Sequence, residues 1–108
     1  MKYNPQPNKK ITGNEAHGAV SKLLSVMMPK GIVDFKFTTT PHPGNYFMSH
    51  ATIVVPDGTI ENSSMTIINR FKSDTIKEIT TKIRQYLGFN VLFTKVRIIE
   101  ESKLKSIE

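Results

Sequence analysis

The clearest pattern along the chain is that of an amphipathic helix. Apolar side chains recur at the spacing of one helical face: Ala16, Ala19, Val20, Leu23, Leu24, Met27 and Met28. Thr12 and Glu15 have the spacing of a capping box, in which each side chain accepts a hydrogen bond from the other residue's backbone amide. Pro29 disfavours helical geometry at the residue before it. The pattern therefore predicts a core-facing helix from about Glu15 to Met28.

Alternating apolar and polar residues predict a half-buried strand over residues 32–38. Val33, Phe35 and Phe37 fall on one side of this strand, and Asp34 and Lys36 fall on the other. Residues 39–45 contain two prolines and a glycine, which is typical of a rigid loop.

Two further β-branched and aromatic runs lie within residues 46–68, on either side of Pro56-Asp57-Gly58. Such a triplet is typical of a tight turn, because proline presets φ and glycine accepts the left-handed conformation. We therefore expect a β-hairpin, although its register is open by one residue. The preferred core-facing residues are Phe47, Ile53 and Val55, and the more polar face carries Met48, His50 and Thr52.

A second helix is predicted to begin at Ser73 or Thr75, where Thr75 and Glu78 have capping-box spacing. Gly88 is suited to the position that follows the helix. The apolar stripe of this helix consists of Ile76, Ile79, Ile83, Tyr86 and Leu87. A last strand over residues 90–99 is expected to carry Leu92, Val96 and Ile98 on one side.

These elements predict an α+β fold of the order α-β-β-β-α-β. Two amphipathic helices on one face of a mostly antiparallel sheet would form a two-layer sandwich. The first three strands can form a meander, and the last strand, which returns after a helix, should pair in parallel at one edge. We expect a flexible basic arm over residues 1–11, a single domain over residues 12–99 and a charged tail over residues 100–108.

Composition narrows the classes of function. The chain of 108 residues has no cysteine and a formal net charge of +6, which excludes disulfides and thiolate sites and favours polyanionic partners. No apolar run reaches the roughly 18 to 20 residues of a membrane span, and the first ten residues lack the apolar segment of a signal peptide. A soluble, cytoplasmic protein with no membrane partner is the expectation.

No motif in the sequence predicts an enzyme. His50-Ala51-Thr52 matches half of the signature of two-histidine phosphoesterases, but His42, the other candidate, has no hydroxyl residue at the matching position. The three histidines lack the spacing of metal ligands, and no carboxylate pair is placed for acid–base catalysis. Phosphate-binding and dinucleotide glycine motifs are also absent. We therefore expect no catalysis, no metal and no cofactor.

The predicted binding site consists of basic side chains. Residues 62–99 contain seven Lys and Arg against two acidic residues. Arg70, Lys72 and Lys77 fall at the predicted start of the second helix, where free amides and the helix dipole attract phosphate. The predicted nucleic-acid-binding residues are Arg70, Lys72, Lys77, Arg84, Lys9 and Lys10.

The order of a helix, three strands and a helix resembles the layout of double-stranded RNA-binding domains. In that family a loop between the first two strands enters the minor groove, and lysines at the start of the second helix contact phosphates. Here Pro41-His42-Pro43-Gly44 would correspond to the loop, and Arg70, Lys72 and Lys77 to the lysines. The family has no counterpart of the last strand.

Two functions remain open at this point. The first is a small basic protein that binds the phosphate backbone of duplex RNA or DNA without catalysis. The alternative is a protein-interaction module, an inhibitor or adaptor such as phages and mobile elements encode, whose partner could be an acidic protein surface. It would dock through its sheet or through Phe71 and neighbouring basic residues. Salt dependence separates the two, because backbone binding weakens steeply as salt rises, whereas docking through an apolar patch does not.

Overall fold

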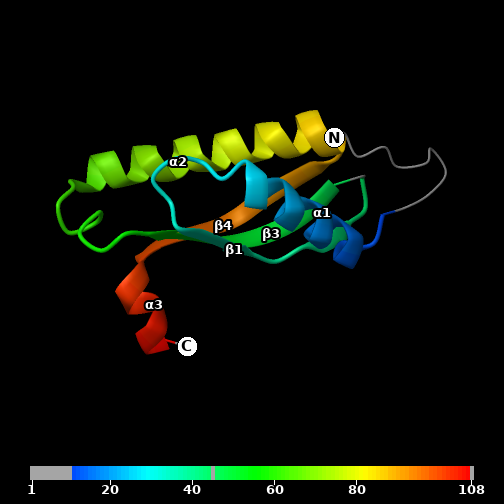
Figure 1. Ribbon diagram of the computed structural model, residues 1–108. Coiled ribbons are helices and arrows are strands. Elements are labelled where there is room, and N and C mark those ends of the chain that lie inside the picture. Colours follow the sequence, from blue (N-terminus) through cyan, green and yellow to red (C-terminus); the bar gives the residue numbers. More distant parts are fainter. Residues whose placement is uncertain (1–10, 45, 108) are drawn as a thin grey trace.

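The computed structural model describes residues 11–44 and 46–107 of the chain (Figure 1). Its elements are, in order, α1 (Gly13–Val26), β1 (Asp34–Phe37), β2 (Thr40–His42), β3 (Tyr46–Val55), α2 (Met65–Lys82), the π-helix η1 (Ile83–Leu87), β4 (Asn90–Glu100) and α3 (Glu101–Ile107). The predicted α+β class and the order α-β-β-β-α-β are confirmed.

β3 is the central strand of the sheet. β1 and β2 pair antiparallel with the same edge of β3 and in the same register, so they are two parts of one hairpin arm, interrupted at Thr38 and Thr39. β4 pairs in parallel with the other edge of β3, which confirms the predicted parallel edge strand. The predicted meander is wrong, because its third strand, expected within residues 59–68, is absent. The additional strand is β2, which lies in the stretch expected to be a loop and follows β1 end to end along β3.

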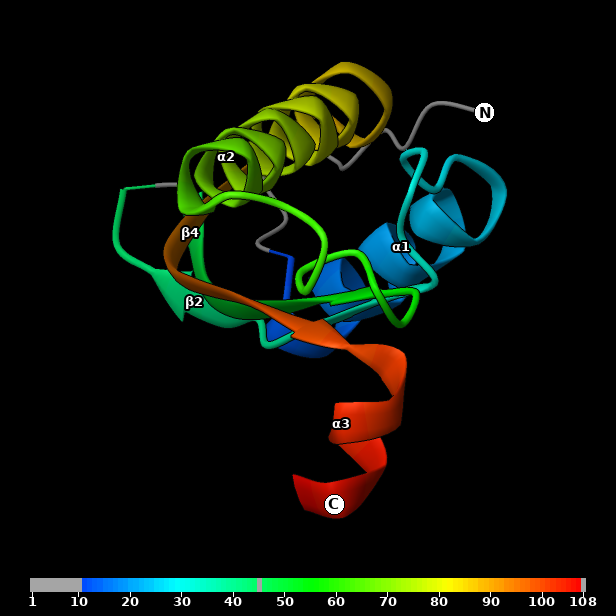
Figure 2. The ribbon, with the colours of Figure 1, turned by 90° about the vertical axis from the view of Figure 1, so that its left-hand side faces the viewer.

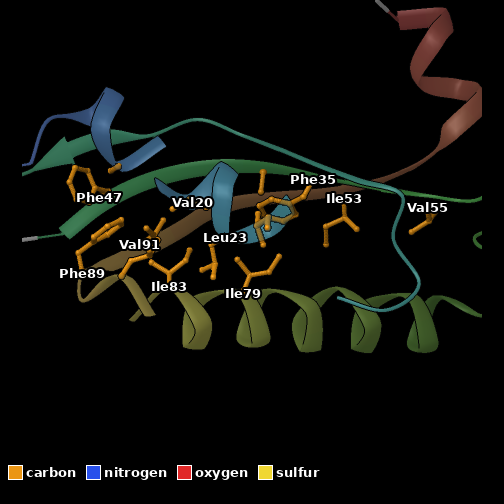
Figure 3. Close-up of a cluster of buried hydrophobic side chains, with 14 residues drawn as sticks. Val20, Leu23, Phe35, Phe47, Ile53, Val55, Ile79, Ile83, Phe89 and Val91 are labelled. Atoms are coloured by element: carbon orange, nitrogen blue, oxygen red, sulfur yellow. The ribbon is translucent and has the colours of Figure 1, made fainter. Parts of the chain in front are cut away.

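α1 and α2 lie on the same face of the sheet, whereas α3 lies beyond the opposite face (Figure 2). The core fills the space between the two helices and the sheet (Figure 3). The predicted capping box of Thr12 and Glu15 is present at the start of α1. The predicted inward residues of β3 are buried, as is most of the predicted stripe of α1. The labelled side chains of α2 and η1 that point toward the sheet are Ile79 and Ile83.

The predicted hairpin over residues 46–68 is wrong in its second half. Gly58 has the expected positive φ, 93°, but the turn leads toward α2 and not into a return strand. The β-branched run Thr66-Ile67-Ile68 favours a strand locally. However, both edges of β3 are already occupied, one by β1 and β2 and the other by β4, so residues 59–68 have no place beside it.

The start of the second helix was also predicted wrongly. α2 begins at Met65, and the hydroxyl of its N-cap Ser64 accepts from the amide of Ile67 at 3.3 Å. Thr75 is a buried residue in the middle of the helix, so the capping box predicted there does not exist. Ile68 lies one turn after the start of α2 and is buried. Its burial stabilises the first turns of the helix, which precede the predicted start.

A β-bulge changes which residues of β4 face the core. The register with β3 shifts between Ser49 and His50, where Phe93 and Lys95 are the successive partners. Thr94 is the extra residue, so the alternation of sides reverses there. Phe93 and Val96 both pack against the core. The predicted placement of Leu92 on the same side as Val96 and Ile98 is wrong: those two pack against the core, whereas Leu92 is 52% exposed on the other face.

The end of the described chain is ordered into secondary structure. Glu100 is the last residue of β4 and is buried. α3 (Glu101–Ile107) covers the region expected to be a charged tail. The basic arm expected over residues 1–11 lies almost entirely outside the described residues, although Ile11 packs against the core. No helix in the described part of the chain is both long and apolar enough to cross a membrane.

Candidate functional site

The structure separates the basic residues that the sequence analysis grouped together. Arg70, Lys77 and Arg84 are exposed and follow one another at seven-residue intervals along α2 and η1. Seven residues are close to two helical turns, so these side chains share one side of the helix at steps of roughly 10 Å. Asp74 and Glu78 lie between them on the exposed surface of α2 and lower the net positive charge of this row.

Lys72 is apart from this row. It is partly buried and lines a shallow hollow of about 300 Å³ between α2 and β4, together with Lys77 and Val96. Lys9 and Lys10, the remaining predicted residues, lie outside the described residues.

The true start of α2 at Met65 corrects the prediction of a phosphate site beside Arg70 and Lys72 at the start of this helix. Arg70 and Lys72 lie well inside the helix, where backbone amides already donate to carbonyls of the preceding turn. The first turn itself carries apolar side chains, with Met65 73% exposed and Ile67 59% exposed. Free amides and basic side chains therefore do not meet at this helix end.

A different set of basic residues meets on the face of the sheet opposite α1 and α2, which we call the outer face. Lys36 on β1, Thr52 on β3 and Arg97 on β4 are successive partners in one cross-strand row. In the next row, His50 on β3 is the partner of Lys95 on β4. Each of these side chains alternates with a core-facing neighbour, so all of them point to the outer face.

The geometry of this face holds Arg97 in place. Its Nε donates a hydrogen bond of 3.0 Å to Oγ1 of Thr52, which leaves the terminal nitrogens of the guanidinium free for a further partner. Lys95 makes no ion pair with any described residue. Asp34, an acidic residue of β1, is in register with Val54, beyond the basic rows, and its Oδ1 accepts from the amide of Phe35 at 2.8 Å. Asp34 is therefore not an ion-pair partner of Lys95 or Arg97.

The next two rows of the outer face add apolar and aromatic side chains. Met48 is in register with Leu92, and Tyr46 is in register with His42. The rings of His42 and Tyr46 stack with centroids 4.6 Å apart. The outer face therefore combines cations, aromatic rings and aliphatic side chains on one surface.

The histidines do not form a catalytic pair. His42 is in register with Tyr46, whereas His50 lies four positions further along β3, a separation of about 13 Å along the strand. Among residues 11–44 and 46–107, no three His, Asp or Glu side chains come close enough to hold a metal ion. The half-signature His50-Ala51-Thr52 places both polar side chains on the outer face instead.

The sequence contained a partial signal for the outer face. Alternation alone assigned His50 and Thr52 to the polar side of β3. Lys95 and Arg97 could not be assigned to the surface that carries His50 and Thr52, because this requires the bulge at Thr94 and the register of β4 against β3. Both features depend on partners distant in sequence.

The likeness to double-stranded RNA-binding domains does not extend to the placement of the binding elements. Pro41-His42-Pro43-Gly44 lies at the end of the sheet where β4 begins, and α2 starts at the opposite end (Figure 1). The loop and Arg70 thus do not converge.

What the fold defines is an α+β protein with two helices on one face of its sheet and a basic surface on the other. No family model, curated protein or solved structure matches the chain.

Proposed function

We propose that this protein binds nucleic acid through the outer face of its sheet, contacting phosphates without catalysing a reaction. The observation that carries this proposal is the meeting of Lys36, Lys95 and Arg97, with His50 among them, across three paired strands on a face that α1 and α2 leave open. Phosphate neutralisation by Lys and Arg supplies most of the affinity in non-specific nucleic-acid binding.

The local geometry suits a phosphate ligand. Because Arg97 uses Nε to contact Thr52, its two terminal nitrogens stay available for phosphate oxygens in a charge-assisted contact. Lys95, one row away, adds a second cation on a rigid strand. Sites on strands hold their side chains more firmly than sites on loops do.

Two charge-matched double variants test the site. Lys95→Gln with Arg97→Gln removes two cations from the outer face, and Arg70→Gln with Lys77→Gln removes two from α2. Binding to labelled nucleic acid is measured by fluorescence anisotropy over a series of salt concentrations. We expect the outer-face variant to flatten the plot of log affinity against log salt by about one unit per lost contact, and the α2 variant to leave it nearly unchanged.

Two results would contradict the proposal. If only the α2 variant flattens the slope, the binding surface is the row of basic residues on α2. If wild-type protein binds no nucleic acid at low salt, the proposed function fails altogether. The interaction module then takes its place, for which exposed Met65 and Ile67 in the first turn of α2 are the apolar contacts to examine.

A further inference from the structure

The outer face is divided into two halves along β3. The cationic half consists of the rows that contain Thr52 and His50, with Lys36, Lys95 and Arg97 as their partners. The other half consists of the next two rows along β3, and we call it the apolar half after Met48, Leu92 and Tyr46. Thr40 completes the row of Met48 and Leu92, and His42 and Asn90 complete the row of Tyr46. The two halves adjoin, so a ligand on one half reaches the other.

The apolar half is accessible to a ligand. Leu92 is 52% exposed, and Met48 and Tyr46 are partly exposed. The His42 ring is stacked on Tyr46 with an interplanar angle of 29°. Aromatic and aliphatic side chains standing side by side on a strand surface form a platform of the kind on which nucleic-acid bases stack.

α3 limits the face at its other end. Val54 points to the outer face, as its register with Asp34 and Ile99 requires, yet it is only 1% exposed. α3 follows β4 directly and packs against β3 on this side of the sheet (Figure 2). The accessible part of β3 therefore runs from Thr52 to Tyr46, a length of roughly 20 Å, comparable with the shortest binding sites of about four nucleotides on single strands.

We infer that the ligand of the outer face is a single-stranded nucleic acid, an inference that rests on the proposed function. In a duplex the bases are stacked inside and phosphates form the outside, so a duplex would cover Leu92 and Met48 with charged groups and use only the cationic half. A single strand offers phosphates and base faces side by side. Its phosphates lie on Lys95 and Arg97, and its bases on Leu92 and the His42–Tyr46 stack.

The first experiment compares probes on the wild-type protein. Fluorescence anisotropy at one salt concentration is measured with labelled single-stranded DNA and single-stranded RNA of the same length and with the matching duplexes. We expect at least one single-stranded probe to bind about tenfold more tightly than its duplex. Equal or tighter duplex binding overturns the inference but leaves the proposed function intact, whereas no binding to any probe removes the proposed function itself.

The second experiment removes the platform without removing charge. Single-strand affinity should fall about 5- to 100-fold in the double variant His42→Ala with Tyr46→Ala, which corresponds to the loss of one stacked base. The salt slope should stay unchanged, because no phosphate contact is lost. Leu92→Ser tests the same half at an exposed position that contributes little to folding, and a loss of about threefold or more is expected.

Met65→Ser is the matched control, since it removes an exposed apolar side chain from α2, far from the outer face. It should leave affinity unchanged, and thermal melts should show that every variant is folded. If Leu92→Ser and the His42 and Tyr46 variant both bind single strands as well as wild type does, bases do not lie on the apolar half. The inference is then wrong even if Lys95→Gln with Arg97→Gln weakens binding.

Discussion

Glu100 and Ile60, forty positions apart in sequence, are joined by a hydrogen bond of 2.9 Å from the Ile60 amide to Oε2 of the Glu100 carboxylate. The same oxygen accepts from the amides of Gly58 at 3.0 Å and Glu61 at 3.2 Å. Glu100 is only 5% exposed. This carboxylate therefore holds the connection between β3 and α2 against the end of β4.

We expect Glu100→Ala to lower the free energy of unfolding by about 2 to 4 kcal/mol, because three backbone amides lose a charged acceptor. Glu61→Ala is the matched control, since it removes an exposed carboxylate from the same turn, and it should change stability by less than about 0.5 kcal/mol. Urea denaturation measures both. Equal effects of the two variants would mean that the buried carboxylate does not hold the turn.

The start of α2 can be tested by its cap. Ser64→Ala should cost about 1 kcal/mol, because the Ile67 amide loses its acceptor. Ser73→Ala, at the start predicted from the sequence, should cost less than about 0.5 kcal/mol, because this exposed residue lies within the helix. If thermal melts showed Ser73→Ala to be more destabilising than Ser64→Ala, the helix would begin at Ser73 instead.

The buried stripe of α1 makes a similar comparison possible. Leu23→Ala should destabilise the protein by roughly 2 to 5 kcal/mol, because it leaves a cavity between α1 and the sheet. Val26→Ala lies on the same helix at a side chain that is 79% exposed, and it should cost less than about 0.5 kcal/mol. Calorimetry that finds both variants equal to wild type would mean that the stripe does not face the core.

Most of the features predicted correctly from the sequence are local; the exception is the parallel pairing of the last strand, which follows from its return after a helix. The capping box of Thr12 and Glu15 needs only residues three apart, and the positive φ of Gly58 needs only its own turn. The alternation along β3 assigned Phe47 and Ile53 to the core without knowledge of their partners.

The features that could not be predicted depend on contacts between distant segments. Thr66-Ile67-Ile68 has the composition of a strand, but the occupied edges of β3 and the packing of Ile68 make it the start of α2. The bulge at Thr94 determines that Lys95 and Arg97 share a face with His50. The candidate site depends on the register of β4 against β3, and these two strands are separated in sequence by α2 and η1.

The hydrogen bond between Thr52 and Arg97 provides the most specific test of the outer face. Thr52→Val keeps the side-chain shape and every charge but removes the acceptor of the Arg97 Nε donor. We expect it to weaken nucleic-acid binding about two- to tenfold, because the guanidinium loses its orientation, at an energy near that of one hydrogen bond. The salt slope should change little, because the cation remains.

A double-mutant cycle separates this positioning role from a general effect on the sheet. The cycle compares wild type, Thr52→Val, Arg97→Gln and the double variant by anisotropy at fixed salt. If Thr52 acts through Arg97, its substitution should have no further effect once Arg97 is replaced, so that the two losses are strongly non-additive. Purely additive losses would show that Thr52 contributes independently of Arg97.

Arg97→Lys separates the charge of this residue from its geometry. Compared with Arg97→Gln, it should restore the salt slope but only part of the affinity, because an ammonium group cannot contact Thr52 and present a planar pair of donors at once.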